Sequence, residues 1–294
     1  MNNGSASDRN FSAAVSATDG KQERRRQIQV SYRRAMGEGR TSKLGAFPWA
    51  TLFITLLTLG IWCVTAYQVA LSAGAHTLKD VLASVFAESE NGDVLIAFGA
   101  KYNIAIIAGQ YWRLVTPIFL HATILHVGLN MLNFLLLGLI LERIFGHTRF
   151  ILIYLFTGMV SILASFLFAP QEISVGASGA IFGLVGAYSI FVARHRRAFW
   201  YGGVIALSWL LLVIGVNVGL GFVIPDVDNY AHVGGLLTGC LLGWFFAPFY
   251  VVMTREGQPQ LADVHSLMRR WPLALFFSGL LLLIAIIAIH SVGG

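Results

Sequence analysis

Long apolar stretches alternate with short polar ones along most of this chain. Runs of about 20 apolar residues are long enough for a helix to cross the hydrocarbon core of a bilayer. The pattern predicts seven membrane-spanning helices, at 48–70, 121–141, 150–168, 178–193, 201–220, 231–250 and 273–290. We therefore expect an all-α polytopic membrane protein.

The stretches outside these spans divide the chain further. Residues 1–46 are polar and basic and are expected to form a disordered cytoplasmic tail. Residues 47–252 hold the first six spans. Within them, residues 71–120 form a large external loop. Loops of this length are often functional, and this one is apolar enough that we expect it to lie partly in the membrane interface. Residues 253–294 supply a cytoplasmic link and the seventh span.

Composition excludes an ordinary soluble domain. Of 294 residues, 56% are hydrophobic and only 12% are charged. Soluble domains have about a quarter of their residues charged. The two cysteines, Cys63 and Cys240, both fall in predicted spans, so a disulfide or a thiolate metal site is not expected.

Basic residues predict the orientation. Of the 20 Lys and Arg residues, 17 lie in the tail or in the links 2–3, 4–5 and 6–7, all on one side of the membrane. Lys79, Lys101 and Arg113 lie on the other side. Cytoplasmic loops retain Lys and Arg, so the N-terminus is predicted inside and the C-terminus outside. The net charge of +6 then reflects topology. No nucleic-acid partner is expected, because no base-reading motif is present.

Four polar residues gather near the outer ends of spans 2, 4 and 6: His126, Asn130, Ser178 and His232. Polar groups inside spans are costly and mark functional sites. His126 and Asn130 are four residues apart, so they project from one side of their helix, about 40° apart. Glycines four residues apart, Gly179 with Gly183 and Gly239 with Gly243, allow helix backbones to approach closely.

These residue types predict a Ser–His dyad. A serine hydroxyl becomes a good nucleophile when an adjacent base takes its proton, and His232 is the base available in span 6. No Asp or Glu lies within a span to orient it; Asp226 and Asp228 lie nearby in the loop before span 6. An oxyanion would need fixed donors, from His126, Asn130 and the backbone N–H groups of residues 176–178, which just precede a helix.

Each residue also has a structural interpretation. Ser178 alone would be a helix cap or a packing serine, and either histidine alone a helix–helix hydrogen bonder. A metal site from His121, His126 and His232 is disfavoured, because His121 and His126 diverge by about 140° on a helix and no carboxylate accompanies them. A transporter or channel would show polar residues at the midplane, not only near one surface. No cofactor is expected.

Five motifs then resemble the rhomboid family of intramembrane serine proteases, over residues about 48–252. In the family's order they are "YWR" at 111–113, "HATILHVGLN" at 121–130, "LER" at 141–143, "GASG" at 176–179 and "AHVGG" at 231–235. The resemblance implies a six-helix rhomboid-like core plus one C-terminal transmembrane helix.

The resemblance also implies roles. Ser178 would be the nucleophile and His232 the general base, with His126, Asn130 and the Ser178 N–H as oxyanion partners. His121, Trp112 and Arg113 would support the first loop, and Glu142 and Arg143 would form a polar cluster on the inner face. Phe182 stands where many members have Tyr, and its ring can still stack on the catalytic histidine.

The function that the resemblance implies is cleavage of single-pass transmembrane proteins near the external membrane face. A seventh helix after the core argues against a mitochondrial location; a bacterial inner membrane fits the chain, as would a eukaryotic secretory membrane. The alternative is a catalytically inactive relative that binds transmembrane helices. The sequence does not indicate the oligomeric state.

Overall fold

The structure is a computed structural model. It describes residues 47–87, 91–196, 227–255, 258–265 and 267–293, together with isolated positions elsewhere. The predicted tail, 1–46, and the fifth span, 201–220, lie essentially outside the described residues.

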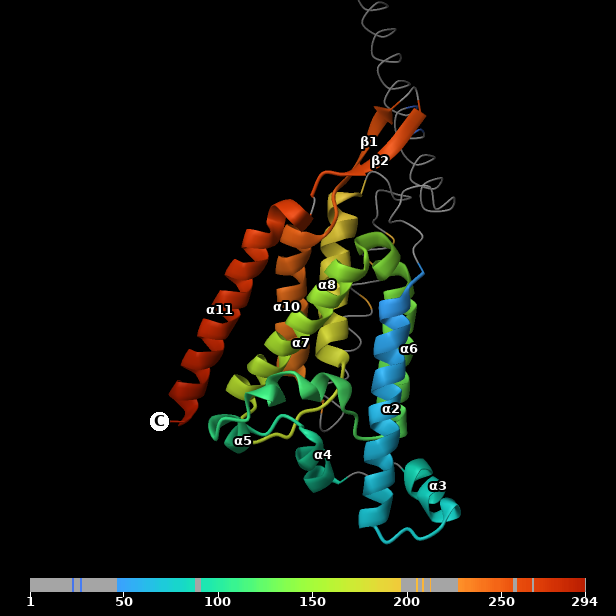
Figure 1. Cartoon of the computed structure of the whole chain (residues 1–294), viewed down its shortest axis with the longest axis vertical. Coiled ribbons are helices and arrows are strands. Elements are labelled where there is room, and N and C mark those ends of the chain that lie inside the picture. Colours follow the sequence, from blue (N-terminus) through green and yellow to red (C-terminus); the bar gives the residue numbers. More distant parts are fainter. Residues whose placement is uncertain are drawn as a thin grey trace, which may run out of the picture.

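The described part is mostly helical (Figure 1). Four helical segments are long and apolar enough to cross a membrane: α2 (Trp49–Ser72), α6 (Ile124–Phe145), α7 (His147–Phe168) and the stretch Arg270–Val292 of α11 (Leu267–Gly293). Two further helices, α8 (Ser178–Arg194) and α10 (Asn229–Phe246), are shorter. Each of these six helices lies on a span predicted from hydropathy.

The helix boundaries depart from the predictions for local reasons. The Thr123 hydroxyl accepts a hydrogen bond from His126 N at 3.2 Å and caps α6, so His121 lies in the loop before that helix. Gly146, with a φ of +79°, separates α6 from α7, which begins three residues earlier than expected. Helix α10 ends at Phe246, and the chain then forms an antiparallel hairpin of β1 (Tyr250–Arg255) and β2 (Gln258–Asp263) that hydropathy did not predict.

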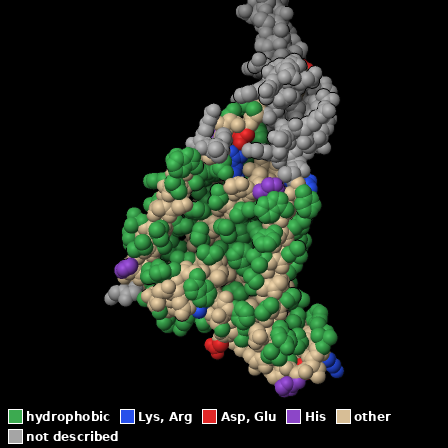
Figure 2. Space-filling view, in the orientation of Figure 1, with side chains coloured by type: hydrophobic (Ala, Val, Ile, Leu, Met, Phe, Trp, Pro, Cys, Tyr) green, Lys and Arg blue, Asp and Glu red, His purple; other side chains and the backbone are tan. Residues whose placement is uncertain are grey.

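The helices form a bundle in which α8 is the central element (Figure 1). Helix α8 packs against α7 and α10, α2 packs against α6, and α11 lies at the opposite edge of the bundle. Fully buried apolar side chains such as Phe134, Tyr154 and Leu184 form the core. Hydrophobic side chains also cover much of the outer surface (Figure 2), as expected for a surface that faces lipid.

Glycines bring α8 and α10 into backbone contact, as the sequence predicted. A Cβ atom on Gly235 would lie 2.0 Å from Gly179 O, and one on Gly239 would lie 1.9 Å from Gly183 O. No side chain fits at either position. The second and third turns of α10 are therefore held directly against the first two turns of α8.

The long loop is largely structured and lies at the end of the bundle away from the hairpin (Figure 1). It contains α3 (Leu78–Phe86), α4 (Gly92–Phe98), α5 (Asn103–Ile107), η1 (Tyr111–Leu114) and η2 (Thr116–Phe119). The buried Arg113 guanidinium donates to Ile96 O at 2.7 Å and Ala100 O at 2.9 Å. Arg113 thus supports this loop, as the resemblance implied.

At the other end of the bundle, Glu142 connects two helices through hydrogen bonds. Its carboxylate accepts from Ala50 N at 2.9 Å, Thr51 N at 2.7 Å and Thr51 Oγ1 at 2.6 Å, and it also contacts His147. A carboxylate at a helix N-terminus satisfies unpaired N–H groups and interacts favourably with the helix dipole. Glu142 therefore joins the end of α6 to the beginning of α2.

Candidate active site

Ser178 and His232 are in contact. Ser178 is the first residue of α8, His232 lies in the first turn of α10, and Ser178 Oγ is 2.8 Å from His232 Nε2. The meeting of these two side chains, 54 positions apart, was expected from the sequence. With the Nδ1 tautomer, the hydroxyl donates to Nε2, which is the geometry that proton transfer requires.

The His232 ring is held by packing. It is only 8% exposed and stacks on the Phe182 ring, with the centroids 4.6 Å apart and the planes at 26°. The stacking predicted for a phenylalanine at this position is therefore present. Among the described residues, His232 Nδ1 has no hydrogen-bond partner. The described part of the chain thus presents a pair, without a carboxylate that orients the histidine.

Asp228 is the N-cap of α10, a role that the sequence analysis did not assign to it. Its carboxylate accepts from Ala231 N at 2.9 Å, so it is the N-cap of α10, and its backbone oxygen accepts from His232 N at 3.2 Å. Asp directly before a helix is a common N-cap, and that rule was the available signal. Asp226 lies outside the described residues.

His126 lies beside the nucleophile. Gly176 has a φ of +124°, a conformation that favours glycine. A Cβ atom on Gly176 would lie 2.8 Å from His126 Nε2 and 3.8 Å from Ser178 Oγ. The His126 ring and the Ser178 hydroxyl therefore border the same small space, which only glycine leaves open.

The backbone donors are fewer than the sequence indicated. Gly176 N donates to Pro117 O at 2.9 Å, and Ala177 N donates to His121 Nε2 at 3.3 Å. Both N–H groups are outside helix pairing, as expected, but both have partners. Ser178 N belongs to the first turn of α8, where N–H groups have no intrahelical acceptor. His121 thus supports the segment before Ser178.

Asn130 is buried, but its amide is turned toward its own helix. Its Nδ2 donates to His126 O at 3.1 Å. The structure therefore brings Ser178, His232 and His126 together, while the Asn130 amide would have to rotate to donate to a group bound beside Ser178.

Lys101 is a second residue that the sequence analysis did not assign to the site. Its side chain is fully buried, and Nζ donates to Ala169 O at 2.5 Å and Glu172 O at 2.9 Å. The backbones of Lys101 and Ser174 exchange two hydrogen bonds, of 3.0 and 3.3 Å. Lys101 therefore joins the external loop to the segment that leads into Gly176 and Ser178. A lone lysine in the apolar stretch "AFGAKYNIAII" was the available signal.

We expect Lys101→Met to lower the free energy of unfolding by about 3 kcal/mol, because two buried carbonyls lose their donor. Thermal unfolding in detergent measures this. Burial lowers the pKa of Lys101 to about 8, and the nearby Asp228 and Glu172 charges oppose that shift. The unfolded chain then binds the proton more tightly between about pH 8 and pH 10.4, so the native protein gains stability as pH rises through this window.

The stability difference between native protein and Lys101→Met should therefore widen from pH 8 to pH 10. Lys79→Met, a change of an exposed lysine in α3, is the matched control and should show no such trend. A difference that is constant or shrinks over this range would contradict the assigned burial of the Lys101 ammonium.

Comparison with known proteins links this geometry to a family. Residues 108–249 match the family model described as "Rhomboid domain", and this region contains Ser178, His232, His126 and Asn130. The chain is 33% identical over 144 residues to "Putative rhomboid protease YdcA" of Bacillus subtilis, covering 49% of this chain and 71% of that protein. The chain belongs to the rhomboid family. This rhomboid, with its long apolar helices, is an integral membrane protein.

Two other relatives are larger proteins. This rhomboid is 41% identical over 169 residues to "Rhomboid protease GluP" of Bacillus subtilis, covering 58% of this chain and 32% of that protein. It is also 41% identical over 152 residues to "RHOMBOID-like protein 4" of Arabidopsis thaliana, covering 50% of this chain and 38% of that protein. The chain thus spans about a third of the length of these two relatives.

Proposed function

We propose that this rhomboid is an intramembrane serine endopeptidase that cleaves transmembrane proteins. The observation that carries the proposal is the 2.8 Å contact between Ser178 Oγ and His232 Nε2, within helices that are apolar elsewhere. A hydroxyl and an imidazole at this distance form the minimal unit of nucleophilic catalysis. The relatives named as rhomboid proteases support the same chemistry.

In the first step, Ser178 Oγ attacks the carbonyl carbon of a peptide bond while its proton passes to His232 Nε2. The C–O bond forms, and the carbonyl π electrons move to oxygen, giving a tetrahedral oxyanion. When this intermediate collapses, the C–N bond breaks and His232 donates the proton to the departing amine. An acyl-enzyme remains on Ser178.

In the second step, His232 takes a proton from a water molecule, whose oxygen attacks the acyl carbon. Collapse of the second tetrahedral intermediate breaks the bond between the acyl carbon and Ser178 Oγ, and His232 returns its proton to Oγ. The product leaves as a carboxylic acid, which then ionises in water. Water has to reach the site from the membrane surface, because the helices around it are apolar.

The oxyanion donors in this proposal are the Ser178 N–H, an N–H of the His126 ring and the Asn130 amide after rotation. Donors fixed before the reaction stabilise developing charge without reorganisation. The small space bordered by Gly176, His126 and Ser178 Oγ is where the oxyanion would lie. His126 Nε2, the ring nitrogen that borders this space, supplies the donor in the tautomer that protonates it.

The proposed substrates are single-pass membrane proteins cut near the external face of the membrane. A peptide bond inside a helix has its carbonyl engaged, so the segment has to unwind before it can be cut, and glycine or proline favours unwinding. The proposal includes a core at 47–252 with six spans, a seventh span, a cytoplasmic N-terminus and an external C-terminus. We place the protein in a bacterial inner membrane.

The test is cleavage of a reconstituted single-span substrate. Ser178→Ala should reduce the rate by on the order of 10³-fold or more, because the nucleophile is lost. Ser189→Ala, in the same helix, removes a hydroxyl that donates to Val185 O within that helix and should leave the rate unchanged. If Ser178→Ala cuts at the native rate, the proposal fails. If the folded native protein binds substrate without cutting it, the chain is a binder of transmembrane helices.

We expect Asn130→Ala to reduce turnover by about 10- to 100-fold, less than loss of the nucleophile, because two other donors remain. The effect should fall on kcat more than on KM, since the amide would donate only to the charge that develops during reaction. Steady-state kinetics on the same substrate separates the two parameters. Asn133→Ala, whose amide also bonds a carbonyl of α6, is the control. A loss carried entirely by KM would assign Asn130 to substrate binding.

A further inference from the structure

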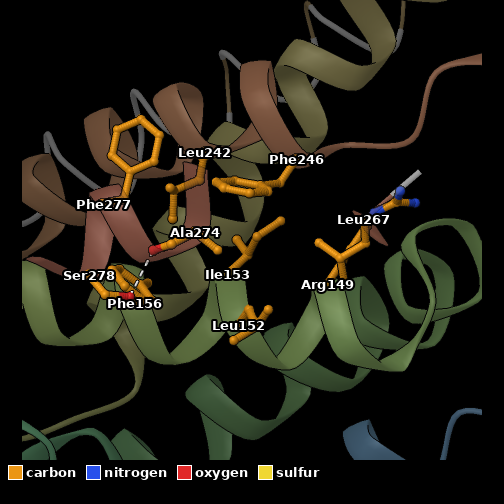
Figure 3. Close-up of a pocket in the computed structure, with 10 residues that line it drawn as sticks. All are labelled: Arg149, Leu152, Ile153, Phe156, Leu242, Phe246, Leu267, Ala274, Phe277 and Ser278. Carbon is orange, nitrogen blue, oxygen red and sulfur yellow. Dashed lines mark hydrogen bonds between the residues drawn. The ribbon is translucent and has the colours of Figure 1, made fainter. Parts of the chain in front are cut away.

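An apolar cleft lies between α7, α10 and α11, near the end of the bundle where Glu142 lies (Figure 3). It holds about 420 Å³ of empty space, part of it open to the surroundings. The residues that line it are Arg149, Leu152, Ile153, Phe156, Leu242, Phe246, Leu267, Ala274, Phe277 and Ser278. None of them belongs to the candidate active site.

Away from Arg149, at one end, the lining excludes water as the natural occupant. The Ser278 hydroxyl donates to Ala274 O at 2.8 Å and is satisfied within its own helix. A buried water needs two to four polar partners, which the aliphatic and aromatic side chains do not provide. The cleft runs along α7 and α11, which both contain stretches long and apolar enough to span a membrane. Inside a bilayer, the hydrocarbon chains of lipids are the groups available to fill such an apolar cleft.

Helix α11 contacts the bundle both at the cleft and beyond it. Near the cleft, the Phe277 ring packs against Phe245 and Phe246, with centroid distances of 5.3 and 6.0 Å. Toward its C-terminal end, Ala288 and Ile289 pack with Phe166. The helix is thus fixed along its length.

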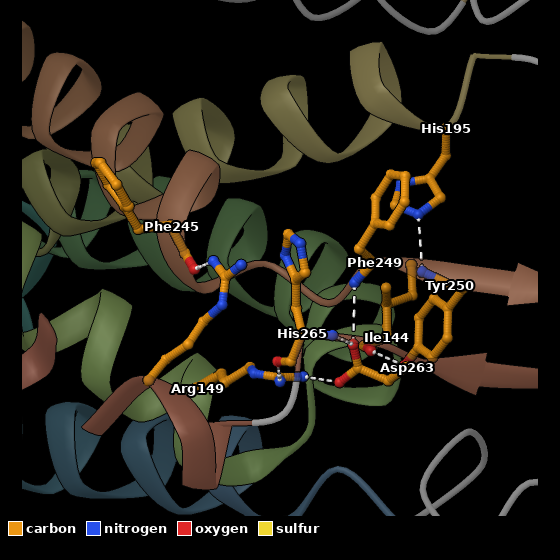
Figure 4. A network of polar contacts seen from close by, with 9 residues as sticks. Ile144, Arg149, His195, Phe245, Phe249, Tyr250, Asp263 and His265 are labelled. Atoms are coloured by element: carbon orange, nitrogen blue, oxygen red, sulfur yellow. Dashed lines mark hydrogen bonds and ion pairs between the residues drawn. The ribbon is translucent and has the colours of Figure 1, made fainter. Parts of the chain in front are cut away.

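Three arginines and a histidine gather at one end of the cleft; we call Arg149, Arg194, Arg270 and His265 the basic cluster. Figure 4 shows two of its members, Arg149 and His265, beside Asp263. Arg149 pairs with Asp263 at 2.8 Å and donates to His265 O. Arg194 lies 3.4 Å from His265 Nε2 and donates to Trp244 O at 2.7 Å. Arg270 donates to Phe245 O.

The basic cluster carries an excess of positive charge. Asp263 is the carboxylate that contacts it among the residues described, against three guanidinium groups. Arg149 is 7% exposed, and its Nε is buried without a partner among those residues. His265 lies in the link before α11; burial lowers its pKa, and the Arg270 and Arg194 charges lower it further.

We infer that the α7–α10–α11 cleft binds an anionic phospholipid, with an acyl chain in the cleft and the phosphate at the basic cluster. The two halves of the site match the two halves of such a lipid. The aliphatic lining accepts the chain, and guanidinium groups bind phosphate through charge and directed donors. Each basic side chain near an anionic headgroup raises the affinity by about fivefold. This inference does not depend on the proposed protease activity.

The experiment uses the full chain in nanodiscs that contain phosphatidylglycerol or phosphatidylcholine probes carrying a photoreactive group in the acyl chain. Crosslinks are mapped by mass spectrometry. We expect the phosphatidylglycerol probe to label the α7 and α11 segments that line the cleft on the order of fivefold more than the phosphatidylcholine probe. Equal labelling by the two probes would overturn the anionic headgroup, and this comparison needs no variant.

Two variants separate the halves of the site. Ala274→Trp places a large ring in the cleft and should lower phosphatidylglycerol labelling severalfold, whereas Leu275→Trp, at the adjacent 61% exposed position, should not. Arg270→Gln removes one charge and should lower labelling by phosphatidylglycerol about fivefold while leaving labelling by phosphatidylcholine unchanged.

Native labelling of Ala274→Trp would overturn the cleft as the site of the chain. Displacement of the lipid by millimolar inorganic phosphate would show a site for a free anion and would also overturn the inference. Thermal unfolding of each variant identifies loss of labelling that comes from loss of fold; in that case the two-probe comparison on the native protein decides.

Discussion

His232→Ala is expected to reduce substrate cleavage by on the order of 10³-fold or more, about as much as Ser178→Ala does. The Ser178 hydroxyl keeps its proton at neutral pH unless a base takes it, and His232 Nε2, at 2.8 Å, is the base in contact with it. His126 is directed at the other side of the Gly176 space and does not replace it. The double variant Ser178→Ala/His232→Ala should be no worse than either single variant, because the two residues act as a unit.

The matched control is His290→Ala. His290 is an exposed histidine of α11 whose Nδ1 is 2.8 Å from Ile286 O, far along the chain from the site. Its cleavage rate should equal that of the native protein. Thermal unfolding accompanies both measurements, since His232 also stacks on Phe182. A folded His232→Ala protein that cuts within tenfold of the native rate would show that another group activates the nucleophile.

Gly239→Ala is expected to cost about 3 kcal/mol of stability or more and to abolish cleavage as well. The added Cβ would lie 1.9 Å from Gly183 O, an atom of the α8 backbone that cannot move independently of its helix. Overpacking of this kind costs about 1–3 kcal/mol where side chains yield, and more where backbone must shift. The helices would separate at the third turn of α10, two turns after His232, and the His232 ring would move away from Ser178.

Gly60→Ala is the control for this substitution. Gly60 lies inside α2, and a Cβ atom there would meet nothing within 4 Å. Alanine in an open helix position favours the helix by about 0.5–1 kcal/mol, so this variant should be as stable as the native protein or more so. Differential scanning fluorimetry in detergent measures the thermal stability of the Gly60→Ala and Gly239→Ala proteins. A Gly239→Ala protein with native stability would contradict the backbone contact between α8 and α10.

The sequence predicted the parts of the fold that a bilayer imposes. Apolar runs identified α2, α6 and α7 because backbone in lipid must satisfy its hydrogen bonds internally. Where a helix begins depends on local details instead. Thr123 caps α6 two residues after the predicted start at His121, and Tyr250, assigned to a span by its apolar neighbours, begins a strand. Short apolar segments do not distinguish strand from helix.

The candidate site was predictable as far as residue types and helix periodicity determine it. We selected Ser178, His232 and His126 because isolated polar groups inside membrane spans are costly and mark functional sites. The glycine spacing indicated separately that α8 and α10 approach each other. The direction of the Asn130 amide and the partners of Gly176 N and Ala177 N were not predictable, because they depend on how the loop near Pro117 and His121 packs. The role of Lys101 was not predicted for the same reason, because the carbonyls that it binds lie 68 and 71 positions away along the chain.

The most direct test of the central claim is covalent labelling of the native protein with a fluorophosphonate, followed by mass spectrometry of the modified peptide. These reagents react with serines whose proton is taken by a neighbouring base. The account predicts one adduct, on Ser178, that is absent from His232→Ala and unchanged in His290→Ala. An adduct on another serine, or labelling of Ser178 at the native rate without His232, would contradict it.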